Sequence, residues 1–187
     1  NNNWIWGYRE NDPMGGSDPY SASKGCAELI TASYQKSFFE QHPCNIASAR
    51  AGNVIGGGDW APNRIVADFF RAVSDRQALL LRNPHSVRPW QFVLEPLSGY
   101  LMLCAKLLKN GKGFSGAWNF GPAGVSHHTV LDLVEEMIRI SGNGSYTVEQ
   151  GGLQAHEAHL LHLDVSKAVN LLRWCPVLDF LEAVKCT

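Results

Sequence analysis

Expected helices alternate with short expected strands along this chain of 187 residues, and that order restricts the fold more than any other feature. Asp18-Pro19 marks a helix start, because aspartate accepts hydrogen bonds from unpaired N–H groups and proline fits the first helical position. The helix is expected from Tyr20 to Gln41, with a strand following within residues 45–55. A helix followed by a buried strand indicates an α/β fold.

The same alternation continues along the rest of the chain. Further helices are expected at 65–74, 96–110 and 129–140, and further strands at 78–82, around 92–93, and at 117–120, 146–149 and 160–163. Ser166 and Asp179 are expected to cap two closing helices. The prediction is the C-terminal part of a Rossmann-type doubly wound parallel sheet with a small α/β substrate-binding lobe. Residues 1–60 are assigned to the sheet and 61–187 mainly to the lobe, with returning sheet elements around 90–120.

The first expected helix carries an apolar stripe. Ala27, Ile30, Tyr34 and Phe38 recur at spacings of three and four residues, which places them on one side of a helix. The prediction is that this side faces a core.

Composition excludes several classes of protein. The chain has 16 basic and 17 acidic side chains and a formal net charge of −1, so it has no charge excess for nucleic acid. A hydrophobic fraction of 45% with six tryptophans excludes intrinsic disorder. Five scattered cysteines indicate reduced thiols in a cytosolic protein. The most apolar stretch is too short to span a bilayer, so no membrane partner is expected.

Two motifs resemble ligand sites but lack the right context. Residues 111–116 match the dinucleotide fingerprint G-x-G-x-x-G, yet they follow an expected helix and precede a strand, which is the reverse of a working site. They are predicted to be a loop. His156 and His159 are three residues apart instead of four and have no evident third ligand, so no metal is expected there.

A phenol and an ammonium group occur one helical turn apart at Tyr20 and Lys24. A free tyrosine titrates near pH ~10, and a nearby cation favours the phenolate. Lys24 is therefore expected to stabilise the phenolate form of Tyr20, so that Tyr20 can act as a general base near neutral pH. A chance pair on a solvated helix face is the alternative.

The chain resembles a known family at several motifs. Tyr20-x-x-x-Lys24 and the segment 48–59 resemble the second half of an extended short-chain dehydrogenase/reductase that acts on nucleotide sugars. Within that family, further segments are similar to the CDP-glucose 4,6-dehydratases, namely residues 6–16, 82–85, 88–91, 118–122 and 156–159. The resemblance extends from Trp4 to about Ala183.

This resemblance implies a reaction and a cofactor. In the family, enzyme-bound NAD oxidises C4 of the hexose, water leaves across C5 and C6, and the hydride returns to C6. Tyr20 would take the proton from the C4 hydroxyl, and Lys24 would hold the cofactor ribose. Tyr20, Lys24 and Arg50 are assigned to the cofactor. Oxidation at C4 acidifies the C5 proton, which makes the elimination feasible.

The substrate residues follow from the same resemblance. Asn53 and the glycine loop 56–58 match the place where relatives hold the substrate pyrophosphate, although three glycines also suit a flexible turn. Arg88 is similar to the arginine that grips the diphosphate, with a surface arginine as the alternative. The remaining assignments to the nucleotide side are Arg64, Arg82, Glu157 and His159. Trp90 and Trp118 are expected in the core.

Several expectations concern the whole protein. Thymidine-linked relatives have an arginine in the segment 156–159, so its absence favours cytidine and CDP-glucose as the substrate. The chain lacks the family's cofactor fingerprint and its elimination acid and base, so it is expected to be a fragment that is inactive alone. A homodimer or homotetramer is expected through the Tyr20 helix. The alternatives are another nucleotide-sugar epimerase or dehydratase, a non-catalytic binding module, and a metal-dependent hydrolase.

Overall fold

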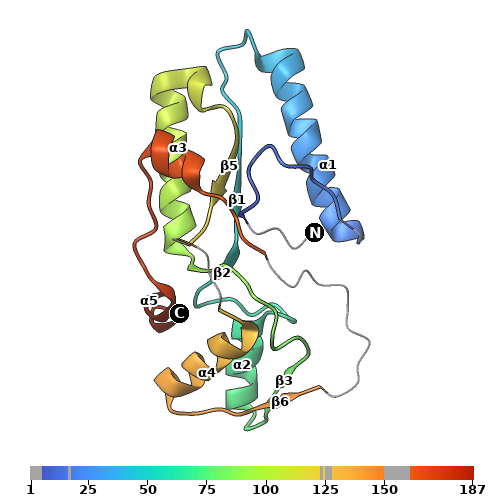
Figure 1. Ribbon diagram of the computed structural model, residues 1–187, viewed down its shortest axis with the longest axis vertical. Helices are drawn as coiled ribbons and strands as arrows, with labels where there is room; N and C mark the ends of the chain where they lie inside the picture. The colour runs from blue at the N-terminus through green and yellow to red at the C-terminus, as the bar shows by residue number, and fades with distance from the viewer. Residues whose placement is uncertain (1–5, 17, 123, 125–127, 150–160) are drawn as a thin grey trace.

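The computed structural model describes residues 6–16, 18–122, 124, 128–149 and 161–187 (Figure 1). The helical elements are α1 (Pro19–Tyr34), η1 (Gln35–Phe39), α2 (Ile65–Ser74), α3 (Leu94–Asn110), η2 (Gly111–Phe114), α4 (Val130–Ser141), η3 (Ala168–Leu172) and α5 (Phe180–Lys185). The strands are β1 (Ala47–Ala51), β2 (Asn53–Ile55), β3 (Leu79–Leu81), β4 (Trp90–Phe92), β5 (Gly116–Phe120) and β6 (Tyr146–Val148).

All strands named above pair in parallel, and they form three two-stranded sheets. β1 pairs with β5, β2 with β4, and β3 with β6. Parallel pairing requires a long crossover between partner strands, and helices fill these crossovers here. The predicted α/β class with parallel strands is confirmed.

The β1–β5 sheet lies between α1 and α3, as Figure 1 shows. Its core joins α3, β5 and η3 through the buried side chains Leu103, Trp118, Phe120, Ala168, Leu172 and Trp174. The rings of Phe120 and Trp174 meet edge to face with centroids 5.0 Å apart. The Trp118 side chain is fully buried, which confirms the prediction that it is a core residue.

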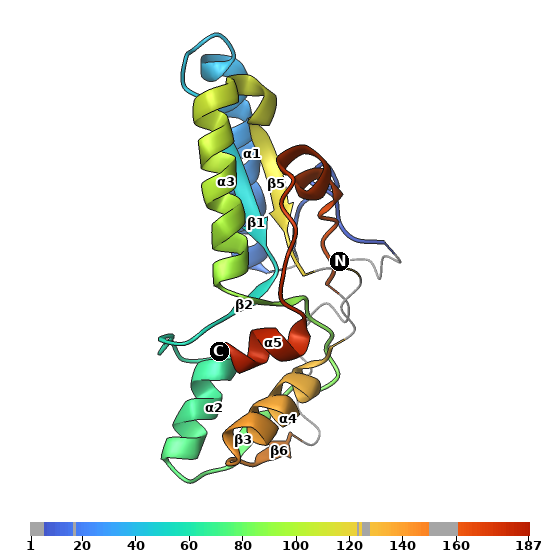
Figure 2. The ribbon, with the colours of Figure 1, turned by 90° about the vertical axis from the view of Figure 1, so that its left-hand side faces the viewer.

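A second core lies in the lobe at the other end of the molecule (Figure 2). It is built mainly by α2, α4, α5 and β3, and its buried side chains include Phe69, Leu81, Leu133 and Val134. Trp90 of β4 is also part of this core, as predicted. α4 begins with a capping box between Thr129 and Asp132, so its first turn is satisfied locally.

Most helix and strand predictions differ from the structure at their ends, but two strand predictions are wrong. The strand expected within 45–55 is divided into β1 and β2, and among the described residues of 160–163 only Leu163 forms an isolated bridge, with Tyr8. α2 spans residues 65–74 as predicted, and Asp179 caps α5. The helix that begins at Pro19 changes to π geometry at Gln35 and ends at Phe39. Ser166 is not a cap, because its N–H donates to the carboxylate of Asp164 at 2.7 Å.

The apolar stripe of α1 does not face a core in this chain, so that prediction is wrong for the described residues. Ile30, Tyr34 and Phe38 are 57%, 56% and 67% exposed. The opposite side of the helix holds buried Gly25 and the carboxylate of Glu28, which bonds to β1. Periodicity identified residues that share a face, but it could not tell which face is covered.

The loop and thiol predictions hold. Residues 111–114 form a single 3₁₀ turn between α3 and β5 rather than a strand-to-helix phosphate turn. All five cysteines are free thiols. Across the described ranges, no helix has both the length and the apolar character needed to cross a membrane.

Candidate functional site

The candidate site is a cavity of about 280 Å³ where β2 ends and α2 begins. It gathers three of the predicted substrate residues, Asn53, Arg64 and Arg88. Apolar side chains of the lobe core complete part of the wall, namely Ile55, Ile65, Val66, Trp90 and Val130. In an open parallel sheet the carboxyl ends of strands are the usual place for a ligand, and β2 ends here.

Arg88 is held in this wall by its backbone. It is only 9% exposed, and its N–H donates to the carbonyl oxygen of His128 at 3.1 Å. Its guanidinium donates to the carbonyl oxygen of Val87 at 2.9 Å. A planar guanidinium with several donors in a partly apolar cavity is suited to bidentate recognition of a diphosphate or a carboxylate.

The glycine loop 56–58 fits its place closely. A Cβ atom on Gly56 would lie 2.8 Å from a side-chain methyl of Val93, so any larger residue would force the loop or that side chain to shift. Gly58 has a φ of +81°, which side chains rarely adopt, and no atom lies within 4 Å of where its Cβ would be. Of this loop, Gly56 lines the cavity.

The other predicted site residues lie elsewhere. Arg82 is exposed after β3 and does not line the cavity. Glu157 and His159 lie outside the described residues, as does His156. Among the described residues, no cluster of three or more histidine, cysteine or acidic side chains could hold a metal ion.

Tyr20 and Lys24 lie together on the first turn of α1, away from the cavity wall. The ammonium group of Lys24 lies 5.7 Å from the centre of the Tyr20 ring, and Tyr20 is 68% exposed. Asp18 fixes the start of the helix, since it accepts the N–H of Ser21 at 2.9 Å and its hydroxyl at 2.6 Å. These two bonds also hold the pKa of the Asp18 carboxyl below its usual value.

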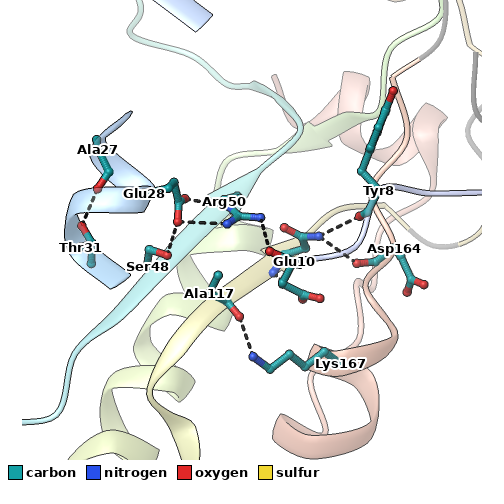
Figure 3. Close-up of polar contacts among 11 residues, drawn as sticks. Tyr8, Glu10, Ala27, Glu28, Thr31, Ser48, Arg50, Ala117, Asp164 and Lys167 are labelled. Carbon is teal, nitrogen blue, oxygen red and sulfur yellow. Dashed lines mark hydrogen bonds and ion pairs between the residues drawn. The ribbon is translucent and has the colours of Figure 1, made fainter. Parts of the chain in front are cut away.

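Arg50 links β1 to α1 and to the N-terminal segment (Figure 3). Its Nε and Nη2 donate to the two carboxylate oxygens of Glu28 at 2.7 and 3.0 Å. Its Nη1 donates to the carbonyl oxygen of Glu10 at 3.2 Å, and the Ser48 hydroxyl donates to Glu28 at 2.6 Å. The guanidinium predicted to meet the cofactor thus holds the Tyr20 helix against the sheet.

The Glu28 contact makes the stability of α1 depend on pH. Hydrogen bonds from Arg50, followed by that from Ser48, hold the pKa of Glu28 below its ordinary 4.5 against the opposing effect of burial. A lowered folded-state pKa gives stability that is present above the unfolded value and is lost as pH falls through the folded value.

We expect Glu28→Gln to reduce the free energy of unfolding at pH 7 by roughly 1.5–3 kcal/mol, because a charged hydrogen-bond acceptor is lost. The difference from the unsubstituted chain should shrink as the pH falls below about 4.5. Urea unfolding at pH 7 and pH 3 measures it. Glu40→Gln, an exposed change just after η1, is the control and should give the same small effect at both pH values. A Glu28→Gln penalty that did not change with pH would contradict this account.

A second polar group, missed at the sequence level, fastens the N-terminal segment and η3 to β5 (Figure 3). The backbone N–H of Asn119 donates to the Glu10 carboxylate at 3.0 Å, and its side-chain amide donates to the carbonyl oxygens of Tyr8 and Asp164 at 2.9 and 3.3 Å. Lys167 donates to the carbonyl oxygen of Ala117 at 2.6 Å, and burial lowers the pKa of its ammonium. An asparagine inside an apolar strand was the available signal.

Gln91 lies beside the cavity residue Trp90 on β4, and its side-chain amide has no hydrogen-bond partner among the described residues, although it is only 2% exposed. A buried polar group without a partner costs about 1–3 kcal/mol. We expect Gln91→Leu to raise the free energy of unfolding by about that amount, measured by urea denaturation. Gln77→Leu, an exposed change before β3, should shift stability by less than about 0.5 kcal/mol. A clear loss of stability in Gln91→Leu would show that the amide is satisfied.

Comparison with known proteins identifies the family of this chain. The family model of GDP-mannose 4,6 dehydratase matches residues 6–187. A CDP-glucose 4,6-dehydratase of Salmonella typhimurium is 50% identical over 181 residues, which cover 94% of this chain and 50% of that protein. The chain thus spans about half the length of this curated relative.

Solved structures share the fold. A dTDP-glucose 4,6-dehydratase from Bacillus anthracis in complex with NAD has a TM-score of 0.74 at 19% identity, covering 97% of this chain and 54% of its own. A UDP-glucose-4-epimerase from Stenotrophomonas maltophila with bound NAD and formylated UDP-arabinopyranose has a TM-score of 0.79 at 16% identity, covering 96% of this chain and 56% of its own. At this identity the likeness shows the fold alone, that of about half of a Rossmann-type protein. By the family model and the Salmonella relative, the chain belongs to the GDP-mannose 4,6 dehydratase family.

Proposed function

We propose that this chain forms the substrate-binding part of an NAD-dependent 4,6-dehydratase that converts CDP-glucose to CDP-4-keto-6-deoxyglucose. The observation that carries the proposal is the cavity that brings together Asn53, Arg88 and Gly56 in a chain half identical to a CDP-glucose 4,6-dehydratase. Backbone amides, a side-chain amide and a guanidinium are the donors that a nucleoside diphosphate needs. Residues 1–60 belong to the cofactor-binding domain in this proposal, and 61–187 mainly to the substrate lobe.

The donors on α1 suit a cofactor ribose. Lys24 and Tyr20 present an ammonium and a hydroxyl on the same exposed helical turn, where ribose hydroxyls could bond to both. NAD bound there would supply the acceptor and later the donor of a hydride. Tyr20 would take the proton from the C4 hydroxyl of the hexose, and Lys24 would hold the ribose beside it. Arg50 and Glu28 would keep this turn in position against β1.

The substrate cavity would fix the sugar through its diphosphate. Arg88 and Arg64 would neutralise the phosphates, while Asn53 and the loop 56–58 would donate hydrogen bonds to them. Oxidation at C4 makes the C5 proton acidic, so that water can leave across C5 and C6. Binding energy at the diphosphate would thereby hold the reacting carbons in one place through all three steps.

Two measurements test the proposal. Isothermal titration of the chain with CDP, UDP and GDP should show a preference for CDP. The chain fused to the first half of the Salmonella relative and supplied with CDP-glucose and NAD should form the 4-keto product, which absorbs in alkali. Formation of a C4 epimer without keto product would identify an epimerase, and binding without any product would identify a non-catalytic module.

The same proposal includes a homodimer, or a tetramer built from two of them, in the cytoplasm. Leu29, Ile30, Tyr34 and Phe38 form an apolar face on α1 and η1 that this chain leaves exposed. Exposed apolar faces of this kind occur at interfaces between protein chains. Sedimentation equilibrium of the fused protein gives the number of chains.

A further inference from the structure

Hydrogen bonds from a side chain of α2 and from one in the loop itself hold the loop between β2 and α2. Arg71 of α2 donates to the carbonyl oxygens of Trp60 and Ala61 at 2.9 and 3.2 Å. Its guanidinium also pairs with the carboxylate of Asp68 one turn earlier. The Asp59 side chain accepts the N–H of Ala61 at 2.9 Å, which closes a tight turn. The backbone at residues 59–61 is therefore fixed.

This fixed backbone presents the Trp60 indole to solvent. Trp60 is 74% exposed, and none of the ring contacts found among the described residues includes it. Asp59, which precedes Trp60, and Asn63, three residues after it, both line the cavity. An exposed indole on an ordered loop does not gain the free energy of removing its apolar surface from water. A ligand that stacks on the ring would supply that burial.

We propose that Trp60 stacks on the pyrimidine base of the nucleotide whose diphosphate binds in the cavity, and that Arg71 positions it for this contact. The inference rests on the proposed function and adds the group that contacts the base. The cavity supplies charged and amide donors for the phosphates, and Trp60 lies on the loop that joins two of its lining residues, Asp59 and Asn63. A planar apolar surface at the rim is the complementary chemistry for an aromatic ring, because every base has a π face.

The roles of the two residues lead to different effects. Loss of the indole removes the stacking surface itself, whereas loss of Arg71 frees the loop that carries it. Trp60→Ala should therefore weaken binding of CDP by about 5- to 100-fold. Trp60→Phe keeps an aromatic face and should retain most of the affinity. Arg71→Gln should fall between Trp60→Phe and Trp60→Ala.

The experiment compares CDP with inorganic pyrophosphate as probes by isothermal titration of the chain. Trp60→Ala should lose affinity for CDP while its affinity for pyrophosphate stays within about twofold of the unsubstituted chain. Leu108→Ala, which removes an exposed apolar side chain on α3 away from the cavity, is the control and should bind both probes normally. Thermal unfolding of each variant confirms that it is folded.

Indole fluorescence gives a second reading that does not depend on the alanine variant. Addition of CDP should quench tryptophan emission in the unsubstituted chain, and the quench should be largely lost in Trp60→Phe. Equal affinity of Trp60→Ala and the unsubstituted chain for CDP would overturn the inference. Equal loss for CDP and pyrophosphate would also overturn it, because Trp60 would then shape the phosphate wall. If the unsubstituted chain binds neither probe, the proposed function fails first and the inference fails with it.

Discussion

Replacing Tyr20 by phenylalanine is expected to lower the rate of keto-sugar formation by about 10²- to 10⁴-fold, the usual contribution of a positioned general base. The change removes one oxygen atom from an exposed side chain, so neither the fold nor the Glu28–Arg50 contact should alter. Binding of CDP should remain within about twofold, because Tyr20 does not line the cavity. The measurement is the alkaline absorbance of product made by the chain fused to the first half of the Salmonella relative.

Tyr34→Phe is the matched control for this prediction. It deletes the same atom from an exposed tyrosine on the same helix, and its ring contact with Phe38 does not involve the hydroxyl. Its rate should match that of the unsubstituted fusion. A Tyr20→Phe fusion that formed product at the normal rate would remove Tyr20 from the mechanism, and the α1 pair with it.

Replacing Arg88 by alanine should weaken the binding of CDP by roughly 10- to 100-fold, because charge-assisted hydrogen bonds to the diphosphate are lost. Arg88→Lys should recover only part of this affinity, since an ammonium is a point charge and cannot bond two phosphate oxygens in the plane of a guanidinium. Isothermal titration with CDP measures both variants. The low exposure of Arg88 makes the loss larger than that of a surface arginine, because water competes less for the contact.

Arg82→Ala provides the comparison for Arg88. Both residues were predicted from the sequence to bind the substrate, but only Arg88 lines the cavity. Arg82→Ala should change the affinity for CDP by less than twofold. If Arg82→Ala had the large effect and Arg88→Ala had none, the diphosphate would have to bind elsewhere than at the end of β2.

The sequence predicted most elements well where local signals were strong. α2 and the cap of α5 follow from short-range patterns, namely apolar periodicity and a side chain that accepts backbone N–H groups. The grouping of Asn53, Arg64 and Arg88 was expected from the family resemblance, and for Asn53 the end of a strand in a parallel fold also indicated a ligand site. Such signals depend on the residue types and their order in the sequence.

Other features depend on contacts between distant residues and could not be read from the sequence. The sequence assigned Arg50 to the cofactor but did not show that its guanidinium pairs with Glu28 of α1. The α1 stripe had the right spacing for a core but lies on an uncovered face. No sequence pattern indicated that the polar side chain of Gln91 would be buried beside Trp90. In each case the burial or pairing of the side chain is determined by residues that are distant in the sequence.

The parallel pairing of all the named strands also affects how fast the chain can fold. Each strand meets a partner that follows it by several intervening elements, as in β1 with β5 and β3 with β6. No pair can therefore form as a local hairpin. The entropy cost of closing a large loop comes before the stabilising contacts of each sheet can form. Refolding from urea should be slow compared with that of a helical bundle of similar size. During that delay the chain is open to proteolysis and aggregation, which favours production at low temperature.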